Sequence, residues 1–139
     1  MQWMMLQQSS PKDYVIATGR TETVRRFIEI CAVELGWNSQ NGEQGIIWKG
    51  EGINEVGVRA DNGSTVIRID KRYFRPTEVE LLLGDSQKAL KELNWHPKTT
   101  LEQIISEMIS HDSEEAEKAL ILRKKGYQLS DPIETIPNI

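Results

Sequence analysis

The fold class follows from residues 14–36, which read YVIATGRTETVRRFIEICAVELG. Residues 14–18 form a short apolar run that is typical of a strand covered on both faces. Thr21 or Thr23 can cap the following helix, and Gly36 is placed to end it. The apolar side chains of that helix recur at helical spacing: Val24, Phe27, Ile28, Cys31 and Leu35. A strand, a turn and a helix in this order are the building block of α/β proteins, so we predict that class.

The next forty residues predict a β-hairpin. After a polar loop over residues 38–45, strand candidates occur at residues 46–48, 56–58 and 66–69. Asp61-Asn62-Gly63 lies between the last two and carries the Asn-Gly pair favoured in two-residue hairpin turns. A mobile loop is the alternative. We favour a hairpin that leads into the segment Arg72–Glu78.

Residues 3–8 read as the apolar end of a helix. Beyond that end and the helix already described, the sequence predicts three more helices. Asp85 is placed to cap a helix over residues 86–93, and Asn94 suits the left-handed position that ends it. Thr100 and Gln103 form the capping box of the next helix. Its apolar stripe is read as core: Leu101, Ile104, Ile105, Met108 and Ile109. A separate last helix is expected from about Asp112 to the basic residues 123–125.

Composition limits the classes of function. The chain has 139 residues and a formal net charge of −4, which argues against a nucleic-acid partner. Its apolar runs are too short to cross a membrane, and residues 1–8 do not form a secretion signal. The single Cys31 is read as a buried core thiol in a reducing compartment, so we expect a cytoplasmic protein. Two histidines and one cysteine, widely separated, give no metal-ligand pattern.

Residues 69–80, IDKRYFRPTEVE, carry the candidate site. Arg72 and Arg75 present planar forks of donors that match phosphate oxygens two at a time. Glu78 can accept hydrogen bonds from neighbouring sugar hydroxyls. Together these side chains suit a nucleotide-sugar, and they include no group that would transform it. The alternative is a surface ion pair between an arginine and a glutamate.

No catalytic machinery is found elsewhere in the sequence. The nearest approach to a dinucleotide-binding turn, Gly50-Glu51-Gly52, has Glu55 where the third glycine belongs. None of the three tyrosines is followed by lysine four residues later, so the Tyr-x-x-x-Lys pair of the short-chain dehydrogenases is missing. His96 and His111 lack a partnered nucleophile and are read as structural. We therefore assign no catalytic residue, no cofactor-binding residue and no metal ligand to this chain.

Three segments resemble one family, the GDP-mannose 4,6-dehydratases of the extended short-chain dehydrogenase/reductase superfamily. They are residues 13–27 with the DYVIATG run, residues 72–79 reading RYFRPTEV, and residues 83–97 from LGD to WHP. The middle segment is the most specific, and the similarity runs from about residue 3 to residue 127.

The resemblance implies that this chain is the C-terminal, substrate-binding part of a split fold, with a small sheet, flanking helices and a β-hairpin but without the Rossmann half. Residues 1–127 would form a partial nucleotide-sugar-binding domain, and residues 128–139 a disordered tail. By position, Arg75 would bind the GDP diphosphate, Glu78 the guanosine ribose hydroxyls, and Arg72 would support them. The intact family enzyme uses NADP and acts on GDP-mannose or a related GDP-hexose.

Three interpretations follow for this chain. It is a split dehydratase that is inactive alone and works with a separate Rossmann half, or a non-catalytic GDP-sugar-binding or interaction module, or a non-functional remnant. Apolar surface made to contact a missing half would be exposed, notably Trp3, Met4, Met5, Ile104 and Met108. We therefore also expect self-association.

Overall fold

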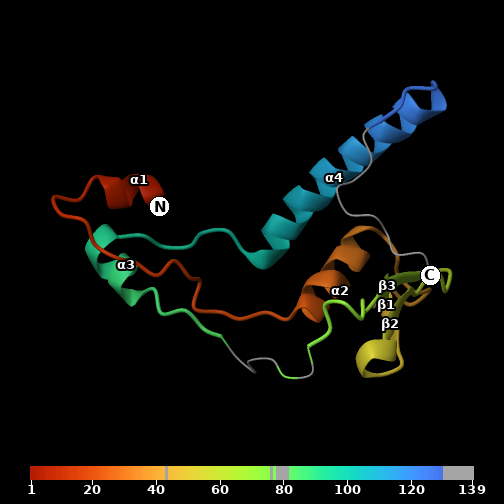
Figure 1. Ribbon diagram of the computed structural model, residues 1–139, viewed down its shortest axis with the longest axis horizontal. Coiled ribbons are helices and arrows are strands. Elements are labelled where there is room, and N and C mark those ends of the chain that lie inside the picture. The colour runs from red at the N-terminus through yellow and green to blue at the C-terminus, as the bar shows by residue number, and fades with distance from the viewer. Residues whose placement is uncertain (43, 76, 78–81, 130–139) are drawn as a thin grey trace.

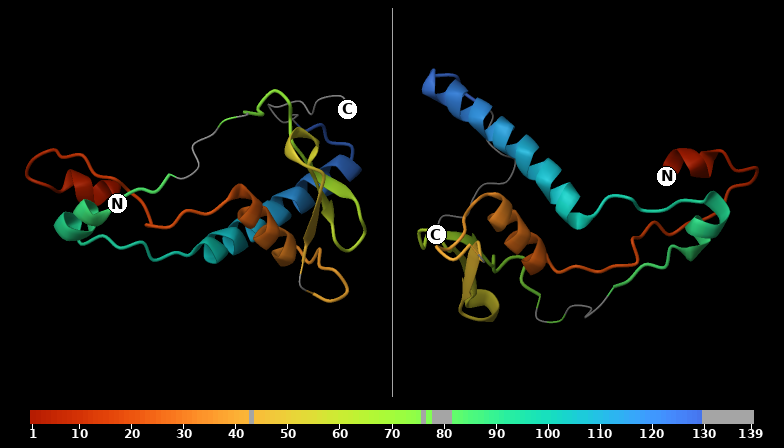
Figure 2. Two further views of the ribbon diagram at one scale, coloured as in Figure 1. Left: turned by 90° about the horizontal axis from the view of Figure 1, so that it is seen from below. Right: turned by 180° about the vertical axis from the view of Figure 1, so that it is seen from behind.

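The computed structural model describes residues 1–42, 44–75, 77 and 82–129. Its elements are, in chain order, α1 (Gln2–Leu6), α2 (Val24–Glu34), β1 (Ile46–Lys49), the 3₁₀ helix η1 (Gly52–Asn54), β2 (Val56–Arg59), β3 (Thr65–Arg68), α3 (Gln87–Leu93) and α4 (Leu101–Lys124). They gather in two groups, with α1 beside α3 at one end and α2, the sheet and α4 at the other (Figure 1). Extended segments join the two groups, so the molecule is elongated (Figure 2). The predicted α/β class is confirmed at this coarse level.

The sheet contains the predicted hairpin. Within the described residues it has the strand order β1-β2-β3, with both pairs antiparallel. The connection between β2 and β3 is longer than the predicted two-residue turn. The hydrogen bond that closes it runs from the backbone N–H of Arg59 to the carbonyl of Ser64, at 2.8 Å. Asn62 Oδ1 accepts from the backbone of Ser64 at 2.9 Å, and Gly63 has a φ of +73°. The Asn-Gly pair therefore shapes a wider loop.

Helix α2 packs against the sheet and α4 packs against α2. Thr23 caps α2 by accepting from the backbone N–H of Arg26, and Gly36 follows the helix at a φ of +72°, both as predicted. The core between these elements consists of small and branched side chains: Ala32, Ile46, Val58 and Ile105. Close packing at Ala32 depends on Gly45, because a Cβ at residue 45 would lie 2.6 Å from the Cβ of Ala32.

Helix α4 is continuous, so the prediction of a separate helix from Asp112 was wrong. It runs 24 residues from the predicted capping box of Thr100 and Gln103. No glycine or proline interrupts residues 101–124, and the polar residues after Ile109 were misread as a boundary. Only the first half of α4 lies against α2, and the second half extends away from the sheet (Figure 1).

Residues 14–18 do not form the predicted strand. Val15 and Ile16 are about half exposed, at 52% and 51%, and no described residue joins them in a β-ladder. They do lie beside residues 82–84, since a Cβ on Gly84 would be 2.7 Å from the Cβ of Ala17, and Thr21 Oγ1 donates to the carbonyl of Leu82 at 2.7 Å. An extended segment becomes a strand only when a neighbour satisfies its backbone groups.

A polar cluster attaches residues 12–14 to α3. Glu92 accepts from Lys12 Nζ and from the Tyr14 hydroxyl, each at 2.9 Å, and Lys88 Nζ donates to the carbonyl of Asp13 at 2.8 Å. Hydrogen bonds from Lys12 and Tyr14 lower the pKa of Glu92, and the one from Lys12 has the largest effect. The N-cap of α3 is Ser86 and not the predicted Asp85, although Asp85 does accept from the backbone N–H of Gln87 at 2.9 Å. Asn94 ends α3 at a φ of +49°, as predicted.

Two predictions about burial are settled by the structure. Cys31 is half-buried rather than fully buried, and its partial burial raises the pKa of the thiol. Trp3 (72% exposed), Ile104 and Met108 are exposed as predicted, whereas Met4 and Met5 are half-buried.

No helix among the described residues has the length and apolar character needed to cross a membrane. Of the predicted tail over residues 128–139, residues 130–139 lie outside the described residues.

Candidate functional site

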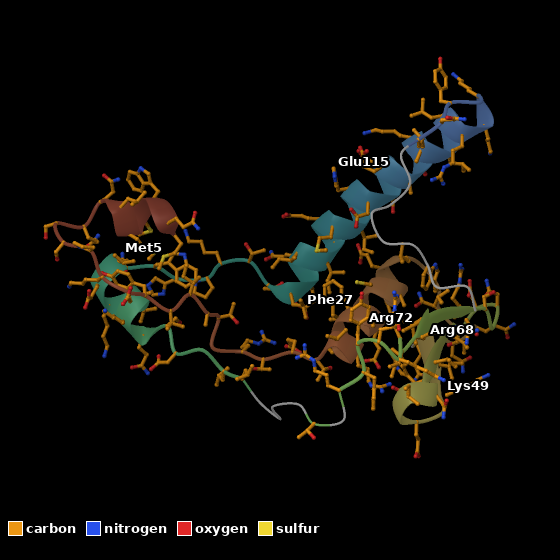
Figure 3. All side chains as sticks on the ribbon, viewed as in Figure 1. Met5, Phe27, Lys49, Arg68, Arg72 and Glu115 are labelled. Carbon is orange, nitrogen blue, oxygen red and sulfur yellow. The ribbon has the colours of Figure 1, made fainter. Side chains whose placement is uncertain are left out.

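Arg72 lies four residues after the last residue of β3, Arg68 (Figure 3). It is held by Asp70, two residues before it. Its Nη2 lies 2.6 Å from Asp70 Oδ2, and its Nε lies 3.0 and 3.2 Å from the two carboxylate oxygens. Asp70 Oδ1 also accepts from the backbone N–H of Arg72 at 2.9 Å, which closes a local turn. The carboxylate therefore fixes both the main chain and the guanidinium of Arg72 as the chain leaves the sheet.

The electrostatics of this pair favour the charged form of Asp70. The hydrogen bond from the Arg72 side chain, followed by the one from its backbone, lowers the pKa of Asp70. The Arg72 side chain is 59% exposed. Its guanidinium carbon lies 5.3 Å from the ring centroid of Tyr73, whose side chain is itself exposed. A cation, an exposed aromatic ring and a fixed turn thus occur together.

The structure describes only part of the predicted site. Arg75 is exposed, three residues beyond Arg72 on the same connecting segment. Glu78 and Pro76 lie outside the described residues, so the predicted pairing of Arg75 with Glu78 around a ligand stays a prediction. The site residue that the sequence reasoning missed is Asp70. Its signal was the Asp-x-Arg spacing, which favours an Asx turn that closes on the arginine.

Two surface hollows lie away from this segment. One, of about 660 Å³, lies between α2 and β1, and the other, of about 620 Å³, lies around Trp95 and residues 16–18. Neither lining includes Arg72 or Arg75. Among the described residues no group of three or more His, Cys, Asp or Glu side chains is placed to hold a metal ion. Among the described residues, Arg72 and Arg75 therefore lie on an exposed connecting segment.

Comparison with known proteins identifies the family. The model of the GDP-mannose 4,6 dehydratase family matches residues 1–108, which include the whole arginine segment. The chain belongs to the GDP-mannose 4,6-dehydratase family. It is 44% identical over 137 residues to a GDP-mannose 4,6-dehydratase of Vibrio cholerae, covering 96% of this chain and 37% of that protein. The corresponding Drosophila melanogaster protein is 49% identical over 112 residues, covering 81% of this chain and 27% of that protein.

These matches cover only part of the length of each relative. This dehydratase-family chain spans about a third of the length of the relatives it matches, and the similarity is to their C-terminal part. The human GDP-mannose 4,6 dehydratase gives the same result, at 39% identity over 81% of this chain and 28% of that protein. The family assignment predicted from the RYFRPTEV run is thus confirmed. The individual roles of Arg72, Arg75 and Glu78 stay predictions.

Proposed function

We propose that this chain is the GDP-sugar-binding part of a GDP-mannose 4,6-dehydratase and acts with a separate NADP-binding half. The supporting observation is that the match spans a third of the relatives' length and includes an arginine segment with one cation fixed by Asp70. The relatives that carry the dehydratase name are about three times as long as this chain. Membership of the extended short-chain dehydrogenase/reductase superfamily, lyase activity and a cytoplasmic location belong to the same proposal.

The two arginines have different roles in binding because their surroundings differ. Arg72 is already neutralised by Asp70, so it orients the segment and contributes part of its charge to a ligand. Arg75 supplies the planar fork that grips the diphosphate, and Glu78 accepts from the ribose hydroxyls. Holding the nucleotide end in this way orients the hexose toward groups on the other half, which lowers the entropic cost of reaching the reactive geometry. Residues 1–127 act as the binding unit in this scheme.

The residues of this chain do not fit NADP. The strand-like run at residues 14–18, which precedes a helix, has Gly19 alone where a dinucleotide-binding turn needs several glycines. No tyrosine in the sequence is followed four residues later by lysine. The chain therefore contributes binding and orientation, and we assign it no proton transfer and no redox step.

The decisive experiment mixes the purified chain with a separately expressed NADP-binding half of a family member and assays GDP-mannose dehydration. We expect activity only when both parts are present. Each half alone, with NADP and GDP-mannose, is the control. Turnover by this chain alone would overturn the proposal. So would a mixture in which the two parts co-purify and remain inactive, because that result identifies a binding module without a catalytic role.

A further inference from the structure

The second half of α4 projects beyond the rest of its own lobe. Helix α2 packs on the first half of α4, and the remainder, up to Lys124, extends away from the sheet (Figure 1). The family model matches residues 1–108, so this projecting part lies beyond the residues it matches. No residue of the candidate sugar site lies on it either.

Charged side chains divide the projecting part into two blocks of opposite sign. Residues 112–117 contain four carboxylates and no cation: Asp112, Glu114, Glu115 and Glu117. Residues 118–125 contain four cations and no carboxylate: Lys118, Arg123, Lys124 and Lys125. The helix dipole accounts for basic residues in the last turn of α4. It does not account for the acidic block, which begins in the middle of the helix, far from the first turn at Leu101.

One stripe of the helix carries a single member of each block. Asp112, Ala116, Ala119 and Arg123 follow one another at spacings of four, three and four residues, so they share one face. The stripe continues the face that begins at Ile105, which is buried in the core beside α2. Asp112 and Arg123 are exposed, and among the described residues neither side chain makes a hydrogen bond or an ion pair.

The remaining charges of α4 do not interrupt this stripe. Glu115 lies beside it and is already paired with Lys118 of its own chain, at 2.6 Å. Helical spacing puts the others on different sides of the helix: Glu114, Glu117, Lys118 and Lys124. The stripe itself therefore carries one anion and one cation, about 16 Å apart along the helix axis.

We propose that a second copy of this chain packs on the stripe, with the two α4 helices antiparallel about a twofold axis between residues 117 and 118. Such an axis places Asp112 of each copy opposite Arg123 of the other, so two reciprocal ion pairs close the two ends of the contact. Between them Ala116 lies opposite Ala119. Short side chains at these positions allow the helices to approach closely.

The order of the charges selects both the partner and its direction. A stripe that runs from an anion to a cation is complementary to its own reversed copy, whereas parallel copies would set Asp112 against Asp112 and Arg123 against Arg123. Leu120 and Leu122, which are 52% and 38% exposed, flank the stripe and provide apolar contact area. The contact spans about three helical turns of each copy, so we place it among the small, weak interfaces. This inference concerns assembly and does not depend on the proposed sugar-binding role.

Sedimentation equilibrium of the full chain with charge variants tests the axis. Asp112→Arg and Arg123→Asp should each raise the dimer dissociation constant on the order of tenfold or more, because each sets like charges opposite one another. The double variant exchanges the two charges and should restore the dimer. Glu114→Arg is the matched control, since it makes the charge change of Asp112→Arg on the opposite side of the helix and should leave the constant unchanged.

Mixing the two single variants gives a readout that a folding defect cannot imitate. The Asp112→Arg chain carries two cations on the stripe and the Arg123→Asp chain carries two anions, so the mixture should form heterodimers although neither variant dimerises alone. Circular dichroism should show the same helix content for all variants, because both residues are exposed. A monomer at all concentrations, a dimer insensitive to both single variants, or a double variant as weak as the single ones would overturn the proposal.

The response to salt separates this dimer from association through exposed apolar side chains such as Trp3. Ion pairs at an exposed contact are screened, so the dissociation constant should rise as sodium chloride is added. Apolar contacts are not weakened in this way. A constant that stays the same or falls with added salt would contradict pairing through Asp112 and Arg123.

Discussion

Arg25 and Glu55 are thirty residues apart, yet Arg25 Nη2 lies 2.7 Å from both carboxylate oxygens of Glu55. The same guanidinium covers the ring of Trp48 at 4.2 Å from the centroid. A single α2 side chain thereby contacts the residue that precedes β2 and a residue of β1. This contact joins α2 to the sheet in addition to the close packing of Gly45 on Ala32 and the Trp48–Glu29 hydrogen bond.

Arg25→Ala should lower the free energy of unfolding by about 1–2 kcal/mol, because it removes a cation–π contact and a hydrogen-bonded ion pair together. Urea denaturation followed by tryptophan fluorescence measures the change. Arg20→Ala is the matched control, since the Arg20–Glu22 pair is local and more exposed, and it should cost less than about 0.5 kcal/mol. Equal effects would show that the Arg25 contact does not hold α2 to the sheet.

Gly45→Ala should destabilise the protein by about 1–3 kcal/mol through overpacking. The added Cβ would lie 2.6 Å from the Cβ of Ala32 and 2.7 Å from its backbone carbonyl carbon, so a side-chain rotation cannot relieve the clash. The melting temperature of the variant measures the loss. Gln44→Ala, at the neighbouring exposed position, should leave the melting temperature nearly unchanged. A stable Gly45→Ala variant would mean that α2 and β1 do not pack this closely.

The carboxyl group of Asp70 should titrate below its ordinary range, because Arg72 lowers its pKa. A depressed folded-state pKa means that the stabilisation is present above the ordinary aspartate pKa and is lost as the pH falls through the folded value. Carboxyl ¹³C NMR measures the midpoint directly. Arg72→Ala should raise the pKa of Asp70 toward its ordinary value, because it removes the side-chain hydrogen bond and keeps the backbone one. It should leave Asp61, whose pKa is lowered by Arg59, unaffected. An Asp70 midpoint that does not respond to Arg72→Ala would contradict the pairing.

Arg75→Ala should weaken GDP binding by the reconstituted two-part protein about tenfold or more, since hydrogen bonds to charged groups contribute about 1.5–3 kcal/mol. Arg75→Lys should give an intermediate affinity, because it keeps the charge and loses the planar fork. Isothermal titration with GDP measures both. The control is Arg20→Ala, which changes another exposed arginine and should bind GDP with the affinity of the unaltered protein. Identical affinities for all of these proteins would remove Arg75 from the site.

Local features were predictable because each depends on neighbours in the sequence. The Thr23 cap, the left-handed Asn94 and the capping box of Thr100 all involve partners within a few residues. The hairpin followed from alternating valines and a turn-forming Asn-Gly pair, although the turn was longer than expected. Asp70 was also within reach of sequence reasoning, because it contacts Arg72 only two residues away.

The sequence by itself determined the family, the hairpin and the helix ends at Thr23, Asn94 and Thr100, since motifs and caps depend on short-range chemistry. Only the tertiary structure decided that residues 14–18 lack a ladder among the described residues and that Arg25 reaches Glu55. These features depend on which segments distant in sequence come into contact. Backbone hydrogen bonds and burial are satisfied between such segments, and no local pattern specifies the partner.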